Sequence, residues 1–227
     1  MSLDIFAWFS ENQNLVNLLF KAVGQTNTMV FSSGLLGLLF GIPLGTLLHL
    51  TKPGNLLQNV VVNKILDIVV NIGRSIPFII LLVSIIPFTR FVTGSAIGTS
   101  AAIVPLTIGA IPFVARLIEG NLMEIPSGLM EAAQAMGATP LQIIRKILLP
   151  EALPGIINSA TVTFVTLMSY SAMAGAVGGG GLGDVGIRYG YQRFDASVML
   201  ITVIILVIIV QLIQSAGNYL AKRIDHR

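Results

Sequence analysis

The sequence predicts an all-α integral membrane protein that crosses the bilayer about five times. Of its 227 residues, 54% are hydrophobic and 10% are charged, whereas soluble domains carry roughly 25% charged residues. A membrane-spanning helix needs about 20 mostly apolar residues. Four stretches without Asp, Glu, Lys or Arg are longer than this: 22–51, 91–115, 152–183 and 196–221. We therefore expect one domain embedded in the membrane.

The expected spans, in chain order, are 23–50, 65–90, 98–120, 154–177 and 196–220. The second is the least regular, because only residues 75–89 separate Arg74 from Arg90. At about 1.5 Å per residue this interval is too short for a hydrocarbon core of about 30 Å. Its helix should extend past an arginine whose side chain reaches the surface, and the preceding "KILDIVVNI" should lie at or enter one interface.

Residues 1–21 are expected to form an extracytoplasmic or interfacial segment, followed by a single transmembrane domain over residues 22–227. Its beginning, "MSLDIFAWFSENQN", carries acidic rather than basic residues, and no small-residue cleavage site follows, so we do not expect a cleaved leader. The absence of cysteine excludes a disulfide framework and thiolate metal sites. The two histidines, His49 and His226, lie near span ends and predict neither a metal site nor a catalytic site.

The basic residues predict an N-terminus outside and a C-terminus in the cytoplasm, because Lys and Arg concentrate in cytoplasmic loops. With five spans in this orientation, nine of the thirteen basic residues lie inside and four lie outside. The inside set is Lys52, Lys64, Arg74, Arg116, Arg145, Lys146, Lys222, Arg223 and Arg227; the outside set is Lys21, Arg90, Arg188 and Arg193. This topology accounts for the net charge of +3 without a nucleic-acid partner.

The cytoplasmic loop 121–153, between the third and fourth expected spans, carries polar helical patterning in "EAAQAMGATPLQIIRKILLP". We expect a first helix capped by Ser127 and ended by Gly137 in a left-handed conformation. Thr139, Pro140 and Gln142 form the pattern of a capping box that starts a second helix. Leu141, Ile144 and Leu148 should share a face of that helix, and Pro150 and Pro154 should end it before the next span. Residues 126–150 are therefore predicted to form a rigid elbow outside the bilayer.

Three interpretations of this elbow compete. It can be an interfacial hairpin that links two spans, a DNA-binding helix-turn-helix, or a docking element for a cytoplasmic partner. The segment from Arg116 to Glu151 has three basic and four acidic residues, which opposes phosphate binding.

The elbow resembles the EAA motif, E-A-A-x3-G-x9-I-x-L-P, of membrane subunits of binding-protein-dependent ABC importers. Every fixed position of the motif is present: Glu131, Ala132, Ala133, Gly137, Ile147, Leu149 and Pro150. The resemblance implies that the loop holds a coupling helix, which seats in a cleft of a separate ATPase and transmits its closure to the spans. The small alanines would allow close approach to that partner.

More of the chain resembles the methionine importer branch, notably "NIGRSIPFIILLVSIIPFTR", "AAIVPLTIGAIPFVARLIE", "LPEALPGIINSA" and "SYSAMAGAVGGGGLG". The resemblance implies a permease for methionine, of either enantiomer, or for close analogues, in a prokaryotic cytoplasmic membrane. It further implies a homodimer of this chain, two ATP-binding cassette subunits that use ATP and Mg, and an extracytoplasmic substrate-binding lipoprotein. The chain itself would bind no cofactor. A permease for another small amino acid or related solute is the alternative.

The fourth span leads into a glycine-rich segment that contains a formal G-x-G-x-x-G at residues 181–186. A dinucleotide site requires this pattern between a strand and a helix, and here an apolar span precedes it. Gly178 to Gly181 are therefore expected to form a flexible exit from the span, followed by an interfacial belt of Tyr189, Tyr191 and Phe194. Alternatively, the outer loop docks a binding protein through Arg188 and Arg193.

Within the spans, Pro77, Pro87, Pro105 and Pro112 should kink helices, which suits either packing or a gated path. Tyr170 and Met173 lie among small residues in "TLMSYSAMAGAVG" and are candidates for the path or gate, although simple packing is the other interpretation. No span centre holds Asp or Glu, which disfavours proton-coupled transport.

The sequence has no G-x-x-x-x-G-K-[ST] phosphate loop and no cluster of catalytic side chains. It therefore predicts a transport subunit without catalysis, driven by ATP hydrolysis in a separate chain. An integral membrane enzyme and a stand-alone channel or carrier are the alternatives.

The charge bias generates a topology prediction. A reporter fused after Asn14 should be active only outside the cytoplasmic membrane, and one fused after Arg227 only in the cytoplasm, because the nine-to-four bias sets the orientation. Activity of paired periplasmic and cytoplasmic reporters at each site is the measurement. A cytoplasmic N-terminus would refute either the five-span count or the orientation.

Overall fold

The computed structural model describes residues 13–224, in which every regular element is helical. The α-helices are α2 (Gln13–Leu50), α3 (Val60–Ser75), α4 (Phe78–Ser84), α5 (Ile86–Thr93), α6 (Thr99–Met123), α7 (Ser127–Ala135), α8 (Pro140–Ile143), α9 (Leu149–Glu151), α10 (Leu153–Ala174), α11 (Gly181–Val185) and α12 (Ala196–Ile224). Three π-helical turns are η1 (Ile144–Leu148), η2 (Gly175–Gly179) and η3 (Gly186–Tyr191). Residues 1–12 of the expected extracytoplasmic or interfacial segment, as well as His226, lie outside the described residues.

Four helical runs are long and apolar enough to cross a membrane: α2, α6, α10 with η2, and α12. The all-α prediction is confirmed. A fifth crossing exists only if α3 and α4 are counted as one bent span. The helix α2 alone has 38 residues, or about 57 Å of helix, which exceeds the hydrocarbon thickness of about 30 Å. It begins at Gln13, so the expected boundary after residue 21 falls inside a continuous helix.

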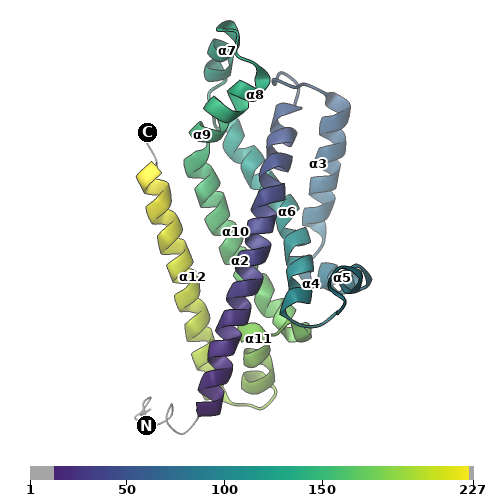
Figure 1. The fold of residues 1–227 in the computed structure, drawn as a ribbon, viewed down its shortest axis with the longest axis vertical. Coiled ribbons are helices and arrows are strands. Elements are labelled where there is room, and N and C mark those ends of the chain that lie inside the picture. The colour runs from purple at the N-terminus through teal and green to yellow at the C-terminus, as the bar shows by residue number, and fades with distance from the viewer. Residues whose placement is uncertain (1–12, 225–227) are drawn as a thin grey trace.

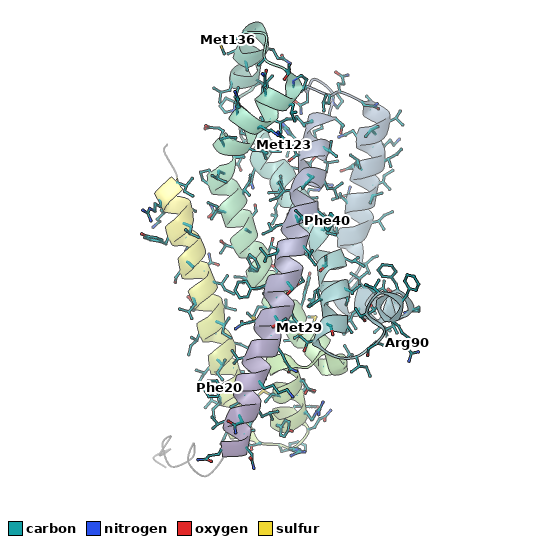
Figure 2. The ribbon with its side chains drawn as sticks, viewed as in Figure 1. Phe20, Met29, Phe40, Arg90, Met123 and Met136 are labelled. Carbon is teal, nitrogen blue, oxygen red and sulfur yellow. The ribbon has the colours of Figure 1, made fainter. Side chains whose placement is uncertain are left out.

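The expected second span is a bent pair of helices rather than one straight helix, because Pro77 interrupts it. The axes of α3 and α4 meet at 99°. Ile76, before the proline, is extended at φ −82° and ψ 121°, since the proline ring disfavours helical geometry at the preceding residue. Helical bonding resumes when the Leu81 N–H donates to the Pro77 carbonyl at 3.0 Å. Arg74 lies in the last turn of α3, and Arg90 in α5 points away from the bundle (Figure 2).

The two ends of the bundle carry different elements (Figure 1). The start of α2 lies beside α11 at one end, and the end of α12 lies at the other end, together with α7 and α8. The structure thus places the elbow and the last described residues of the chain at the same end, opposite the beginning of α2.

The helices α2 and α6 form the most extensive helix pair of the bundle. Glycines recur every four residues along α2 and leave no side chain between the two backbones. A Cβ added at Gly37 would lie 2.7 Å from the Ala110 Cβ, and one at Gly41 would lie 2.6 Å from Val114. One turn further, Gly45 faces the Ala115 carbonyl. Small residues permit such close approach where lipid provides no hydrophobic drive for helix association.

The glycine-rich exit of α10 is a packed reversal rather than the flexible linker that the sequence suggests. Gly178, Gly180 and Gly181 have φ values of +95°, +79° and +79°, which favour glycine. The chain then turns into α11, whose first N–H groups donate to side chains of α2. The Gly181 N–H donates to Gln25 Oε1 at 3.0 Å, and the next N–H, of Leu182, donates to the Thr26 hydroxyl oxygen at 2.9 Å.

The last helix, α12, contacts mainly α10 and leaves a broad apolar face uncovered. Its exposed residues include Leu200, Val203, Ile204, Val207, Ile208 and Leu212. Large aliphatic side chains around a helix of this length suit contact with lipid chains.

The α2–α6 packing generates a stability prediction. Gly41→Ile should lower the free energy of unfolding by about 1–3 kcal/mol through overpacking, because its Cβ meets Val114. Gly24→Ile is the matched control: it makes the same change in the same helix, where no atom lies within 4 Å of the added Cβ. Thermal unfolding in detergent measures the difference. Equal midpoints for the two variants would contradict the packing argument.

Candidate coupling elbow and transport pathway

The bend of the elbow is built from two local motifs. At the end of α7, Gly137 is left-handed at φ +80°. Its N–H donates to the Gln134 carbonyl at 2.9 Å, and the Ala138 N–H donates to the Ala133 carbonyl at 3.0 Å. These two bonds make a Schellman motif, and they confirm the role expected of Gly137. One expectation is wrong: Pro126 occupies the N-cap without a side-chain bond, and Ser127 is already the first helical residue.

The capping box that starts the second helix is confirmed. The Thr139 N–H donates to Gln142 Oε1 at 2.9 Å, and the Gln142 N–H donates to the Thr139 hydroxyl oxygen at 3.4 Å. The expected stop at Pro150 is wrong, because α8, η1 and α9 run on to Glu151, and only Ala152, a turn residue with right-handed helical φ, separates α9 from α10. A wide π turn precedes Pro150, and the Ala152 N–H still donates to the Leu148 carbonyl at 2.9 Å. The second arm of the elbow is therefore joined rigidly to the α10 span.

The elbow is anchored to the bundle by its own hydrophobic core. Ala133, Ile143 and Leu148 are fully or almost fully buried and pack in one cluster with Ile118 and Leu122 of α6. Leu50, the last residue of α2, joins the same cluster. The expected shared face is wrong in one position, because Leu141 is exposed and Ile143 takes the buried place.

The EAA-motif positions divide into inward-facing and outward-facing residues. Ala133 lies in the elbow core with 1% of its surface exposed, so it contacts this chain rather than a partner. Ile147 packs against the same core. The remaining motif residues are exposed or partly exposed: Glu131, Ala132, Gly137, Leu149 and Pro150.

An apolar patch covers the outer surface of α7. It consists of Leu129, Ala132 and Met136, which are all exposed and spaced i, i+3 and i+7 on one helix face. Met136 is 81% exposed and lies at the far tip of the elbow (Figure 2). The motif indicated only Ala132 of these three. The spacing of the two larger residues in the sequence was the signal that could have revealed the whole patch.

Tyr170 and Met173, the two candidate path residues, differ in their surroundings. The Tyr170 ring stacks on Phe78, the first residue of α4, with centroids 4.4 Å apart and planes 2° apart. Met173 is 45% exposed. The stack connects the fourth span to the bent second span, and the proline-led start of α4 places Phe78 there.

Met173 ends an exposed stripe along α10 that contains polar side chains. The α10 stripe is Asn158, Val162, Thr166, Ser169 and Met173, all on one helix face. The Thr166 hydroxyl donates to the Val162 carbonyl, whereas the side chains of Asn158 and Ser169 have no hydrogen bond to another described residue. Unpartnered amides and hydroxyls are costly in hydrocarbon. This face therefore requires water or another chain, unlike the aliphatic face of α12.

A cavity of about 390 Å³ lies between the α4–α5 corner, the start of α6 and the end of α10. It reaches the end of α10 at Ala174 and η2 at Val177, and Thr89 is the only polar side chain among its lining residues. Its walls suit an apolar side chain.

The described residues contain no group of three or more His, Cys, Asp or Glu placed to hold a metal ion. His49 is buried at the end of α2, and neither ring nitrogen has a hydrogen-bond partner. The features that the sequence reasoning missed are thus Phe78, the polar members of the α10 stripe and the apolar patch. The four-residue spacing of Asn158, Val162 and Thr166 was a detectable signal for the stripe.

Comparison with known proteins places this geometry in context. Residues 16–226 match a family model described as "Binding-protein-dependent transport system inner membrane component". The chain is 61% identical over 228 residues to a "Probable D-methionine transport system permease protein MetI" of Vibrio cholerae, and the match covers all of both chains. It is 57% identical over 158 residues to the "D-methionine transport system permease protein MetI" of Escherichia coli K12, covering 70% of this chain and 73% of that protein.

Solved structures match the fold as well. A structure described as "Inward facing conformations of the MetNI methionine ABC transporter" superposes with a TM-score of 0.94 at 52% identity, covering 95% of this chain and 100% of that chain. An "amino acid ABC transporter with histidines" superposes with a TM-score of 0.77 at 17% identity, covering 98% and 100% respectively. The second likeness shows the fold alone.

The α10 stripe generates an accessibility prediction. The chain lacks cysteine, so single cysteines can be introduced without background. Cysteines at Asn158, Ser169 and Met173 should react with a membrane-impermeant thiol reagent, because this face requires water. Cysteines at Val203 and Val207, on the aliphatic face of α12, are the controls and should not react. An unreactive stripe would instead identify a protein interface.

Proposed function

Because the chain belongs to the family of binding-protein-dependent transport system inner membrane components, we propose that it is the permease subunit of an ATP-driven methionine importer. The observation that carries the coupling mechanism is the apolar patch on α7. Leu129, Ala132 and Met136 extend from the bundle, while the other side of the same helix is locked to α6 through Ala133. Such a patch suits a cleft of a cytoplasmic ATPase subunit.

The elbow couples the ATPase subunit to the membrane spans because both of its arms are rigid. Closure of the ATPase displaces α7 through the apolar patch. The Schellman turn at Gly137 and the capping box at Thr139 hold the second arm at a fixed angle to α7. Since α8 runs through η1 and α9 into α10, the displacement passes to the span that carries Tyr170 and Met173. The motif residues Glu131, Ala132, Ala133, Gly137, Ile147, Leu149 and Pro150 form this coupling element.

The translocation path runs along the α10 stripe, with Tyr170 and Met173 as its gate residues. Asn158, Thr166 and Ser169 offer polar groups to a zwitterionic substrate, and the cavity at the end of α10 offers apolar walls to the side chain of that substrate. One chain supplies one wall of this path, which supports a homodimer with two facing walls. The relatives named for D-methionine transport support transport of this enantiomer, and we extend the proposal to both enantiomers.

The complete transporter contains two copies of this chain, two ATP-binding subunits that use ATP and Mg, and an extracytoplasmic substrate-binding lipoprotein. The permease lies in the cytoplasmic membrane of a prokaryote, with its N-terminus outside and the elbow in the cytoplasm. The placement of the elbow and the end of α12 at one end of the bundle supports this orientation (Figure 1). We assign ATP hydrolysis to the ATP-binding subunits, because the described residues of the permease offer a docking surface and a path.

Uptake into liposomes tests the proposal. The permease, its ATP-binding subunit and its binding protein should together accumulate D- and L-methionine only when ATP is supplied. Ala132→Arg should lower both ATPase binding and uptake by about tenfold, because it places a bulky charge in the apolar patch. Gln134→Arg is the matched control, since it adds the same charge on a different face of α7 and should leave both parental.

Two outcomes would contradict the proposal. Methionine uptake by the permease alone, without the ATP-binding subunit, would indicate a stand-alone carrier. Parental ATPase binding and uptake in Ala132→Arg would exclude the apolar patch as the docking surface, and the elbow would then be only a link between spans.

A further inference from the structure

The helix α3 is attached to the bundle by one small apolar contact and by several polar side chains. Only Val70 is buried along its 16 residues, whereas apolar residues such as Ile65 and Ile72 are exposed. Near its start, the Asn63 side-chain amide donates to the Leu48 carbonyl at 2.7 Å and to the Thr51 hydroxyl oxygen at 3.0 Å. Polar contacts bind helices in a membrane, where apolar surface faces lipid without cost. The position of α3 therefore depends on the small apolar cluster of Val70 with Leu48 and Ala115 and on a few hydrogen bonds.

The strongest of these contacts is made by Arg116 of α6. Its guanidinium donates through Nη2 to Asp67 Oδ1 and to Asn71 Oδ1 on α3, both at 2.7 Å. Through Nη1 it donates to Glu119 Oε2, on its own helix, at 2.6 Å. A planar guanidinium can bridge two acidic groups in a fixed geometry, which a lysine ammonium cannot reproduce.

The arginine is part of a neutral, partly buried network that we call the charge joint. The Glu119 side chain is 1% exposed, and Lys52 Nζ lies 2.7 Å from its Oε1. Two cations and two anions therefore balance one another, which a buried carboxylate requires. The joint consists of Lys52, Asp67, Asn71, Arg116 and Glu119, and it fixes the loop after α2, α3 and α6 to one another.

The charge joint is continuous with the elbow. Ile118 and Leu122, which flank Glu119 on α6, pack in the core that holds the elbow residues Ala133 and Ile143. Lys52 Nζ also lies 3.0 Å from the sulfur of Met123, the last residue of α6. A displacement of the elbow therefore moves the α6 end of the joint.

The charge joint is equally continuous with the candidate gate. The helix α3 leads through the bend at Pro77 into α4, and Phe78 at the start of α4 stacks on Tyr170. The distance in sequence from Asp67 to Phe78 is short, and most of it is a single helix. A movement of α3 therefore displaces the Phe78 ring, which packs against the candidate gate residue Tyr170.

We infer that Arg116 is a positioning residue that makes the bent second span follow the elbow. Arg116 binds α3 to α6 through Asp67 and Asn71, so that ATPase closure reaches the gate from two sides, through α10 directly and through α3 and Phe78. This inference rests on the proposed function. A purely structural role for Arg116 makes a different prediction. If Arg116 is a positioning residue, loss of the bridge should leave ATP hydrolysis intact but abolish the gate movement that normally accompanies it.

The double substitution Asp67→Ala and Asn71→Ala removes both contacts of Arg116 with α3 while Arg116 remains paired with buried Glu119, so insertion and assembly should be preserved. In liposomes with the ATP-binding subunit and binding protein, this variant should hydrolyse ATP near the parental rate. The methionine transported per ATP should fall by about three- to tenfold, as expected for loss of one coupling contact. Arg116→Lys should show the same loss, because it keeps the charge but not the bridge.

A second measurement reports the gate directly and needs no transported solute. A single cysteine at Ser169 should change its reactivity toward an impermeant thiol reagent when ATP is bound in the parental complex. This change should be absent in the background that carries both Asp67→Ala and Asn71→Ala. Lys64→Gln is the matched control, since it removes a charge one turn away on α3 without touching the joint, and it should retain both the coupling ratio and the change in reactivity.

Two results would overturn the inference. One is a parental coupling ratio in the variant with Asp67→Ala and Asn71→Ala, with the ATP-dependent change at Ser169 intact. The other is a loss of ATP hydrolysis in proportion to uptake, which would make the joint a simple scaffold. Failure of the parental complex to move methionine would instead refute the proposed function, and the reactivity comparison would still test the joint.

Discussion

The close approach of α2 and α6 is the constraint on which the rest of the structure depends. Glycines of α2 at Gly37, Gly41 and Gly45 let the two backbones touch, and the other elements are attached to this pair. The α10 helix packs on it through Phe164, whose ring fills the space beside Gly34. The reversal into α11 is bonded to Gln25 and Thr26 of α2. The elbow core and the charge joint both lie at the opposite end of the same pair.

The bilayer explains why the exposed faces differ so strongly from one another. Apolar surface is tolerated wherever lipid covers it, so the aliphatic face of α12 needs no partner. Two surfaces do not suit contact with lipid. The α10 stripe places unpartnered polar groups in a span, and the apolar patch on α7 places apolar side chains at the tip of the elbow. Each mismatch is the basis for a proposal: the α10 stripe for a path, and the apolar patch for a docking point.

Local features of the elbow could be predicted because they depend on residues close together in sequence. The left-handed turn at Gly137 and the capping box at Thr139 involve partners within five residues. Short-range hydrogen bonding of this kind can be predicted from the residue types and their spacing. The bend at Pro77 was only half predicted: the proline was evident, but a kink and a 99° corner have the same sequence pattern. The packed glycine reversal was missed, because glycine runs specify either freedom or close packing according to what lies nearby.

The sequence by itself determined the helical class, the membrane setting, the approximate spans and the family, since apolar run length, charge bias and the EAA spacing are properties of the linear chain. Tertiary structure alone decided which side of each helix faces the protein. It turned Ala133 inward and left Ala132 outward, although the two are adjacent alanines of one motif. It also brought Asp67 to Arg116 across 49 residues. Neither result follows from residue type or spacing, because a helix presents every residue on some face and only its neighbours in space select which face becomes the core.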